Sequence, residues 1–359
     1  MKKLTKSIFA IVPALVLTAA CFTSCENLVE ETCIEPSSWS EGKKITSAYV
    51  MASIGTTKTK ASDSLHLSVS ADGLTWTAVN GFASVHESTI GTGHIREPYI
   101  FRKNDGTFVL LARDCSGWGL QNEPGHIYDI TYNSTESQYI YVAFSEDLIT
   151  WKNEHLLKVT SSKWDVSAPR AMYNKAGKCY DIYWTGRNND GVYGIYTTQT
   201  YDFITTKDET NSALFTPSYS VSAGYAVRSG MDYFMVYRDE LVSPETGKGL
   251  DIQIAKMENW GEHFNSLTGR YEYINRLTDQ SQVIGTELPC LYQLEDGKTW
   301  ILLAKKTQNL GTYTILGTSD LSDPSSWVDY SSAVTLNSSS EDATVTRITE
   351  KEYKALVNY

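Results

Sequence analysis

Two glutamates, Glu97 and Glu287, lie one and two residues before a proline, each at the start of an apolar, strand-like run. Carboxyl groups that face each other across a cleft can hydrolyse a glycosidic bond, because one protonates the leaving oxygen while the other activates a water on the opposite face. In the inverting reaction the two groups stand roughly 6.5–9.5 Å apart. The pair is therefore a candidate catalytic site. The alternative is that each glutamate is a surface residue at a strand edge.

Further polar and aromatic side chains near these segments are candidates to bind a sugar. They are Arg96, Arg113, Asp114, Trp118, Arg170 and Arg238. Trp118 stands between two glycines, so it could stack on a sugar ring from a loop, or it could pack at the rim of the fold. Arg170 could bind a hydroxyl or carboxylate of a ligand, or it could lower the pKa of a neighbouring acid.

Two repeated elements indicate the fold that must position these residues. A short phrase ending in tryptophan recurs at residues 70–76, 145–151, 198–203, 256–260 and 319–327, and its third copy lacks the tryptophan. Between the phrases lie hairpin patterns, in which two runs rich in Val, Ile, Tyr and Phe flank a turn, at residues 99–111, 171–183, 226–237 and 290–302. Four strands repeated five times predict an all-β, five-bladed β-propeller.

The repeats also predict the blade boundaries and the place of the site. Four blades run roughly over residues 95–151, 165–205, 221–260 and 284–327, and the remaining blade is shared between residues 47–76 and a strand at 343–348. This closure leaves no open sheet edge. Because the innermost strands of a propeller converge on its axis, we expect Glu97 and Glu287 to reach one funnel from non-adjacent blades. The repeated tryptophans, Trp76, Trp151, Trp260 and Trp327, are expected to pack between blades.

The N-terminus is typical of a targeting signal. A basic segment at residues 1–6 precedes an apolar run at 8–17 that is too short to span a bilayer. We interpret residues 1–24 as a lipoprotein signal peptide, Cys25 as the lipid-bearing residue, residues 25–42 as a tether and residues 43–359 as the propeller domain. Cys21 is the alternative lipidated residue, and a simple periplasmic signal is the alternative to an anchor. The expected location is the outer membrane, the cell surface or the periplasm.

Composition narrows the classes of partner. The net charge of −11 and the pI near 5.1 argue against nucleic acid, which binds clustered Lys and Arg, and they disfavour a polyanionic glycan. The other cysteines show no zinc-ligand spacing, and Cys115, Cys179 and Cys290 are expected to be buried apolar residues. We expect a monomer that binds an oligo- or polysaccharide and has no cofactor or metal. Nothing in the sequence supports a structural calcium.

Four motifs in order and spacing resemble glycoside hydrolase family 43. They are residues 94–111, which look like its first catalytic blade, residues 167–173, which are similar to its Trp-Ala-Pro-acid motif, residues 237–240, and residues 286–292, which contain the Glu-x-Pro pattern. The resemblance covers about residues 60–359. It implies a five-bladed propeller, inverting hydrolysis of arabinofuranosides, xylosides or galactofuranosides, Glu287 as general acid and Glu97 as general base in place of an Asp.

The sequence departs from the family pattern at several positions. The Asp that orients the acid should lie near Ala223 or Gly224, where no acid is present. Arg170 replaces an acid, Ser167 replaces a Trp, and residues 341–343 lack the His of a central calcium site. Losing one general acid or base typically costs about 10²–10⁴-fold in rate, so the departures weaken the prediction of activity without excluding it.

The leading hypothesis is an exo-glycosidase that acts on furanosides such as α-L-arabinofuranosyl branches of plant polysaccharides. The main alternative is a non-catalytic, glycan-binding surface lipoprotein with a degenerate hydrolase site. A third hypothesis is a hydrolase in which Arg170 suits the site to an acidic sugar.

Overall fold

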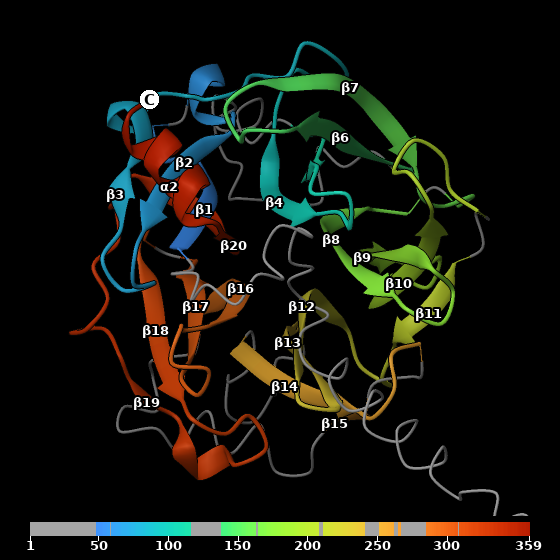
Figure 1. Cartoon of the computed structure of the whole chain (residues 1–359). Coiled ribbons are helices and arrows are strands. Elements are labelled where there is room, and N and C mark those ends of the chain that lie inside the picture. Colours follow the sequence, from blue (N-terminus) through green and yellow to red (C-terminus); the bar gives the residue numbers. More distant parts are fainter. Residues whose placement is uncertain are drawn as a thin grey trace, which may run out of the picture. The chain divides into compact units, whose positions relative to one another are not determined.

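The computed structural model describes residues 48–57, 59–115, 138–162, 164–207, 211–240, 251–261, 265–266, 285–307 and 309–359. All of them belong to one compact unit, Thr32–Tyr359. They form five four-stranded sheets (Figure 1), and the predicted five-bladed β-propeller is confirmed. The predicted signal peptide, the tether, Cys21, Cys25, Cys33 and Trp118 lie outside the described residues.

Each sheet is antiparallel, with its strands following one another outward from the innermost. The first blade is β20 (Ser340–Ile348), β1 (Ala48–Gly55), β2 (His66–Ser70) and β3 (Thr77–Ala78). The second is β4 (Arg96–Arg102), β5 (Phe108–Arg113), β6 (Tyr139–Ser145) and β7 (Trp151–Lys158). The third is β8 (Ser167–Asn174), β9 (Cys179–Arg187), β10 (Tyr193–Thr200) and β11 (Ser212–Phe215). The fourth is β12 (Val221–Ser229), β13 (Asp232–Asp239), β14 (Asp251–Met257) and β15 (Asn265–Ser266). The fifth is β16 (Thr286–Gln293), β17 (Trp300–Lys306), β18 (Tyr313–Thr318) and β19 (Val328–Asp329).

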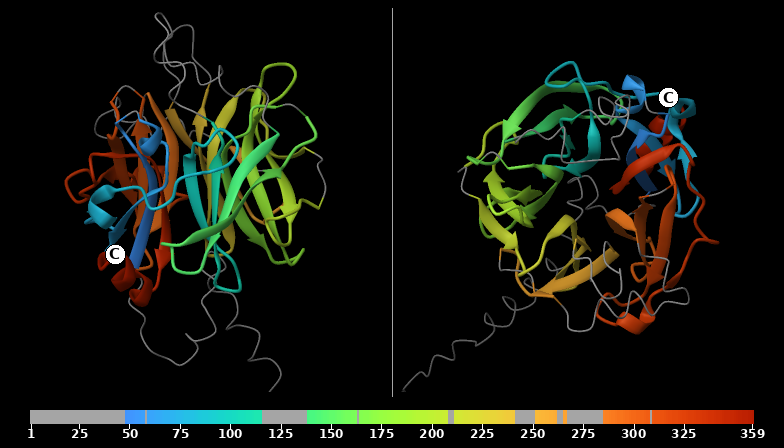
Figure 2. Two further views of the ribbon diagram at one scale, coloured as in Figure 1. Left: turned by 90° about the horizontal axis from the view of Figure 1, so that it is seen from above. Right: turned by 180° about the vertical axis from the view of Figure 1, so that it is seen from behind.

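The first blade closes the ring, as predicted, because its inner strand comes from the other end of the chain. β20 pairs antiparallel with β1 along most of its length. Helix α2 (Glu350–Val357) follows β20, packs against β1 and β2, and ends the chain beside that blade (Figures 1 and 2). Arg102 on β4 donates to Glu352 of α2 at 2.9 Å, which ties the helix to the second blade.

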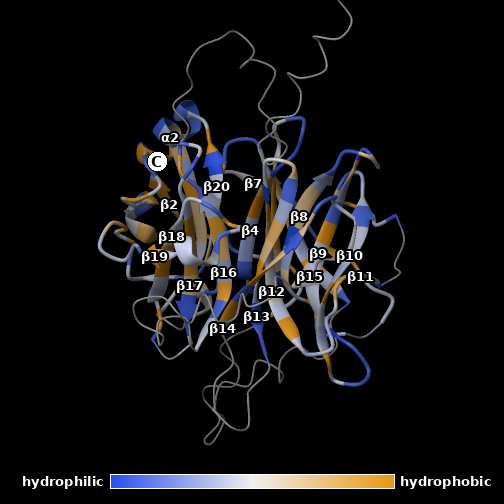
Figure 3. Cartoon of the chain, turned by 90° about the horizontal axis from the view of Figure 1, so that it is seen from below, coloured by the Kyte–Doolittle hydropathy of each residue, from blue (hydrophilic) through white to orange (hydrophobic). Residues whose placement is uncertain are grey.

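The hydrophobic core lies between neighbouring blades. One cluster of buried side chains joins the first and second blades, and others join the second to the third and the third to the fourth. A larger cluster joins the fourth, fifth and first blades. Figure 3 shows hydrophobic residues along the strands of the propeller. Trp76, Trp151 and Trp327 are buried as expected, whereas Trp260 is half-buried and packs against Tyr183 and Tyr233.

Every inner strand carries a β-bulge near its start. At the bulge one non-glycine residue has positive φ: Glu97 (52°), Ala168 (46°), Ala223 (51°), Leu288 (47°) and Asp342 (54°). The register with the neighbouring strand shifts at the same place in all five blades. Such bulges re-aim a side chain, and positive φ costs a residue with a Cβ. The five positions are equivalent, so the residue type at each one sets what that blade presents to the axis.

The repeated tryptophan phrase contains a turn held by an aspartate. Asp147 Oδ1 accepts hydrogen bonds from the backbone N–H groups of Ile149 (2.9 Å) and Thr150 (2.6 Å), and Leu148 between them has positive φ. Asp72 and Asp202 make the same bonds in their blades. Although burial opposes it, these N–H groups lower the pKa of each aspartate below its usual value.

We expect Asp147→Ala to lower the free energy of unfolding by about 1 kcal/mol, the typical value of a hydrogen bond, while Asp147→Asn, which keeps the acceptor oxygen, loses less. Because the folded-state pKa is depressed, the contribution of the aspartate is present above about pH 4 and is lost as the pH falls through the folded value. Urea unfolding at neutral and acidic pH measures both effects. Equal stability of Asp147→Ala and wild type at pH 7 would contradict this role.

Candidate active site

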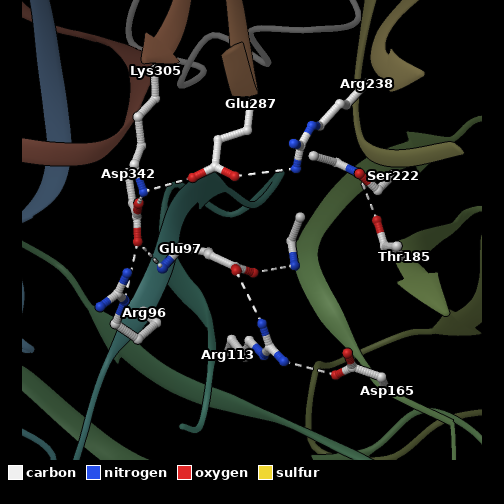
Figure 4. A network of polar contacts seen from close by, with 12 residues as sticks. Arg96, Glu97, Arg113, Asp165, Thr185, Ser222, Arg238, Glu287, Lys305 and Asp342 are labelled. Carbon is white, nitrogen blue, oxygen red and sulfur yellow. Dashed lines mark hydrogen bonds and ion pairs between the residues drawn. The ribbon is translucent and has the colours of Figure 1, made fainter. Parts of the chain in front are cut away.

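The predicted catalytic pair lies in one network of ion pairs and hydrogen bonds at the start of the inner strands (Figure 4). Glu97 comes from β4 and Glu287 from β16, and polar contacts through residues of β17 and β20 connect the two. The pair that the sequence predicts is thus brought together from two blades. Both side chains are largely buried, with 11% of Glu97 and 14% of Glu287 exposed.

Glu97 is held at three points. Its Oε2 accepts from the backbone N–H of Ala168 at 2.5 Å, and its Oε1 lies 3.4 Å from Nη1 of Arg113. Its own N–H donates to Oδ2 of Asp342 at 3.4 Å. Arg113 also binds Asp165 at 2.8 Å, so the guanidinium is shared by two carboxylates. The bulge conformation of Glu97 directs its side chain to the N–H of the next inner strand.

Glu287 faces a cation at each carboxylate oxygen. Its Oε1 lies 3.0 Å from Nζ of Lys305, and its Oε2 lies 3.2 Å from Nη1 of Arg238. Arg238 is also 3.5 Å from Glu240, which accepts a hydrogen bond from the hydroxyl of Ser222. Lys and Arg are donors only, so both oxygens of Glu287 act as acceptors in this arrangement.

Lys305 is the centre of the network. Its Nζ lies 3.0 Å from Glu287, 3.0 Å from Glu341 and 2.8 Å from Asp342. Burial opposes the charge on Lys305, but the three carboxylates outweigh it and raise the pKa of the ammonium well above its usual value. Asp342 is also buried, and Lys305 with Arg96 holds its pKa well below the usual range. Arg96 reaches Asp342 at 3.2 Å and Asp63 at 3.4 Å.

Arg170, a predicted sugar ligand, has a structural role instead. It is only 1% exposed, and its Nη1 donates to the carbonyl oxygens of Pro169 (2.8 Å) and Glu97 (3.3 Å). Its guanidinium lies over the rings of Tyr99 and Tyr225. Arg170 therefore supports the backbone of Glu97 rather than presenting a surface to a sugar, because the side chain after the bulge points into the core.

Asp114 has a local role in the described structure. Its Oδ1 accepts from the N–H (2.9 Å) and the hydroxyl (2.6 Å) of Thr92, which fixes the turn before β4. The half-buried Cys115 next to it is free, as are Cys179 and Cys290, which are both fully buried. Burial raises the pKa of the Cys115 thiol to about 11. The expectation of a buried thiol therefore holds for Cys179 and Cys290 and only in part for Cys115.

Sequence reasoning missed Lys305 and Asp165, and it gave no role to Glu240, which lies in the motif at residues 237–240. A signal for Lys305 exists in the register of the blades, because the residue before each bulge pairs with a residue near the end of the next strand. Glu287 pairs with Lys305 as Arg96 pairs with Arg113, and Ser222 pairs with Arg238. Lys305 thus occupies the position of two arginines that the sequence did single out.

Ala223 is one of the two residues, with Gly224, near which the family resemblance implies an acid-orienting Asp. Its N–H donates to the hydroxyl of Thr185 at 2.7 Å. The carboxylates near Glu287 come instead from Glu240 through Arg238 and from Glu341 and Asp342 through Lys305. Carboxylates therefore still surround Glu287, although the acid that the resemblance implies is absent.

Neither a metal cluster nor a membrane-spanning helix is found in the part of the chain that the structure describes. Within those ranges, no three or more His, Cys, Asp or Glu side chains are grouped so that they could hold a metal ion. No helix among the same residues has the length and apolar character needed to cross a bilayer.

The five blades and the carboxyl groups at their inner strands define a β-propeller with the features of a glycoside hydrolase site. A family model described as "Probable glycosyl hydrolase domain", a relative of glycosyl hydrolase family 43, matches residues 45–354. The chain belongs to this family, and the resemblance drawn from the motifs is confirmed.

Two solved structures with TM-scores of 0.50 or above share the fold. An endo-1,4-β-xylanase from Bacteroides thetaiotaomicron VPI-5482 has a TM-score of 0.54 at 18% identity, with 79% of this chain and 90% of that chain covered. A xylan β-1,4-xylosidase from Bacillus halodurans C-125 has a TM-score of 0.50 at 12% identity, with 84% and 50% covered. An α-L-arabinanase from Cellvibrio cellulosa complexed with arabinohexaose has a TM-score of 0.49 at 15% identity, with 75% and 88% covered. No curated protein matches the chain.

We expect Lys305→Met to destabilise the protein strongly, because removing one partner of a buried ion pair typically costs about 3–5 kcal/mol. The exposed neighbour Lys306 supplies the matched control, Lys306→Met, which should change stability little. The loss should shrink as the pH falls, since protonation removes charge from the carboxylates left unpaired. Chemical unfolding between pH 5 and 8 tests this, and a Lys305→Met protein as stable as wild type at pH 7 would show that the ammonium is dispensable.

Proposed function

We propose that this family member hydrolyses glycosidic bonds of arabinofuranosyl branches on plant polysaccharides, with inversion at the anomeric carbon. The observation that carries the proposal is the meeting of Glu97 and Glu287 in one network from separate blades. Membership of the glycosyl hydrolase family supports the reaction class. The furanoside substrate rests on the motif resemblance alone.

Glu97 fits the role of general base. Its carboxylate is oriented by two donors: the N–H of Ala168 binds one oxygen and Arg113 binds the other. A base of this kind accepts a proton from water as the water attacks the sugar. Glu97 is one methylene longer than the Asp that the resemblance implies, and the bulge with its hydrogen bonds to neighbouring strands sets where the longer side chain ends.

The alternative, a glycan-binding protein without activity, is favoured by two observations. No acid is present at Ala223 or Gly224, where the resemblance implies one, and both oxygens of Glu287 are engaged by cations. The hypothesis of an acidic sugar as ligand has less support, because the cations of the site are already paired. Arg96, Arg113, Arg238 and Lys305 each contact at least one carboxylate of the protein, and Arg170 is buried.

We expect the wild type to release arabinose from aryl α-L-arabinofuranosides or branched arabinan, and Glu97→Gln to lower kcat about 10²–10⁴-fold, as loss of a general base does. The exposed Glu258 on the fourth blade gives the control variant Glu258→Gln, which should keep full activity. Proton NMR of the first-formed anomer tests for inversion.

The same panel separates the alternative function. A wild type that is inert on furanosides and pyranosides but is retarded by a polysaccharide in affinity electrophoresis is a binding protein. Inertness without retardation on any glycan removes both functions.

We propose in addition that the protein is anchored at the cell surface through a lipid on Cys25. The residues concerned lie outside the described structure, so the proposal depends on the sequence pattern of the first 25 residues. Cys25→Ser should abolish incorporation of radiolabelled palmitate and release the protein from membranes, whereas Cys21→Ser should not. Loss of the palmitate label in Cys21→Ser alone would show that Cys21, and not Cys25, is the lipidated residue.

A further inference from the structure

Glu341 stands in the same structural position as Glu287. Each residue immediately precedes the bulge residue of its inner strand, Asp342 on β20 and Leu288 on β16. Each carboxylate lies 3.0 Å from Nζ of Lys305. The site therefore offers two glutamates, from adjacent inner strands, on one ammonium group.

The two glutamates differ in the number of their partners. Glu287 has a cation at each oxygen, and neither Lys nor Arg can accept a proton from it. Among the described residues, the carboxyl group of Glu341 has a single polar partner, Nζ of Lys305. A proton can thus reside on the second oxygen of Glu341 without breaking an ion pair, whereas a proton on Glu287 displaces one.

The charge balance of the cluster favours a proton on one carboxyl group. Its carboxylates are Asp63, Glu240, Glu287, Glu341 and Asp342, and its cations are Arg96, Arg238 and Lys305. His94 lies 3.2 Å from Asp63, and even when it is charged the carboxylates outnumber the cations. The carboxyl group with the fewest partners is the one that should take up the proton.

Electrostatics support Glu341 as that group. Burial, opposed by Lys305 and reinforced by Asp342, raises the pKa of Glu341, whereas Lys305 and Arg96 lower that of Asp342. Two further groups act with Glu341: Arg96, whose positive charge lowers the pKa of Glu341 without cancelling the rise, and Tyr313 on β18, a hydroxyl whose own pKa burial raises above its usual value. The raised pKa favours the protonated form of Glu341, which a general acid requires.

We propose that Glu341, rather than Glu287, donates the proton to the departing sugar oxygen. This inference rests on the proposed hydrolysis of a glycosidic bond. In the step, the bond between the anomeric carbon and the leaving oxygen breaks as the proton of Glu341 passes to that oxygen. Water adds to the anomeric carbon and gives its proton to Glu97. The products are the free sugar and an alcohol, and the proton on Glu97 returns to Glu341 through solvent.

Glu287 then acts as a positioning residue. It holds Lys305 from one side through Oε1 while Arg238 fixes its Oε2. Its negative charge adds to the field that keeps Glu341 protonated, since like charges disfavour ionisation.

The test compares Glu341→Gln with Glu287→Gln on aryl α-L-arabinofuranosides whose phenol leaving groups span a range of pKa. Glu341→Gln should lower kcat/KM about 10²–10⁴-fold on substrates with poor leaving groups and only slightly on a substrate that releases 2,4-dinitrophenolate. The fall of the wild-type rate at alkaline pH should be absent in this variant. Glu287→Gln should keep that fall but move it to lower pH, because one like charge near Glu341 is gone. Glu341→Asp, which restores a carboxyl group, should recover part of the alkaline fall.

Three results would overturn the inference: a leaving-group dependence found only in Glu287→Gln, the same dependence in both variants, or none in either. A wild type without activity on any glycoside would instead remove the proposed function. Thermal unfolding and calorimetric binding of an arabino-oligosaccharide to each variant confirm that the fold and the site persist, so that a change in rate reports the proton transfer.

Discussion

The ion pairs of Lys305 join the fifth blade to the strand that closes the ring. Lys305 lies on β17, and two of its three carboxylate partners, Glu341 and Asp342, lie on β20. β20 comes from the end of the chain and pairs with β1 near its beginning. The closure of the fold and the assembly of the site are therefore one event, because the residues that complete the cluster arrive only when the last strand docks.

The site is asymmetric although the scaffold repeats. Each inner strand has the same bulge, but the residue with positive φ is Glu97 in one blade, Asp342 in another and an apolar residue in the remaining three. Only the two acidic positions contribute a carboxylate from the bulge itself, and they are joined by the N–H of Glu97 and Oδ2 of Asp342. A strained backbone position kept in all five blades thus carries chemistry in two of them. In the others it serves the geometry of the inner strand.

The fold was predictable because its signals are local. The tryptophan phrases report Asp-held turns within a few residues, as the bonds of Asp147 show, and the hairpins follow from alternating apolar residues. The site was predictable only where a residue stands beside such a landmark, as Glu97 and Glu287 do. Lys305 was missed because its role depends on register across strands. The burial of Arg170 was not foreseen because nothing local tells whether the side chain after a bulge faces the funnel or the core.

The acid-orienting Asp that the resemblance implies is absent on one side of Glu287, and carboxylates are present on the other side. Around the ring, β16 lies between β12 and β20. The resemblance implies a carboxylate from the β12 side, near Ala223 or Gly224, and the structure supplies Glu341 and Asp342 from the β20 side through Lys305. A bare pair of extra carboxylates there would repel Glu287, and buried charges without partners are costly. The ammonium group of Lys305 offsets that cost, but among the described residues Glu341 has fewer polar partners than Glu287 or Asp342. The acidic character of the site is retained, and the carboxyl group suited to hold a proton moves from one blade to its neighbour.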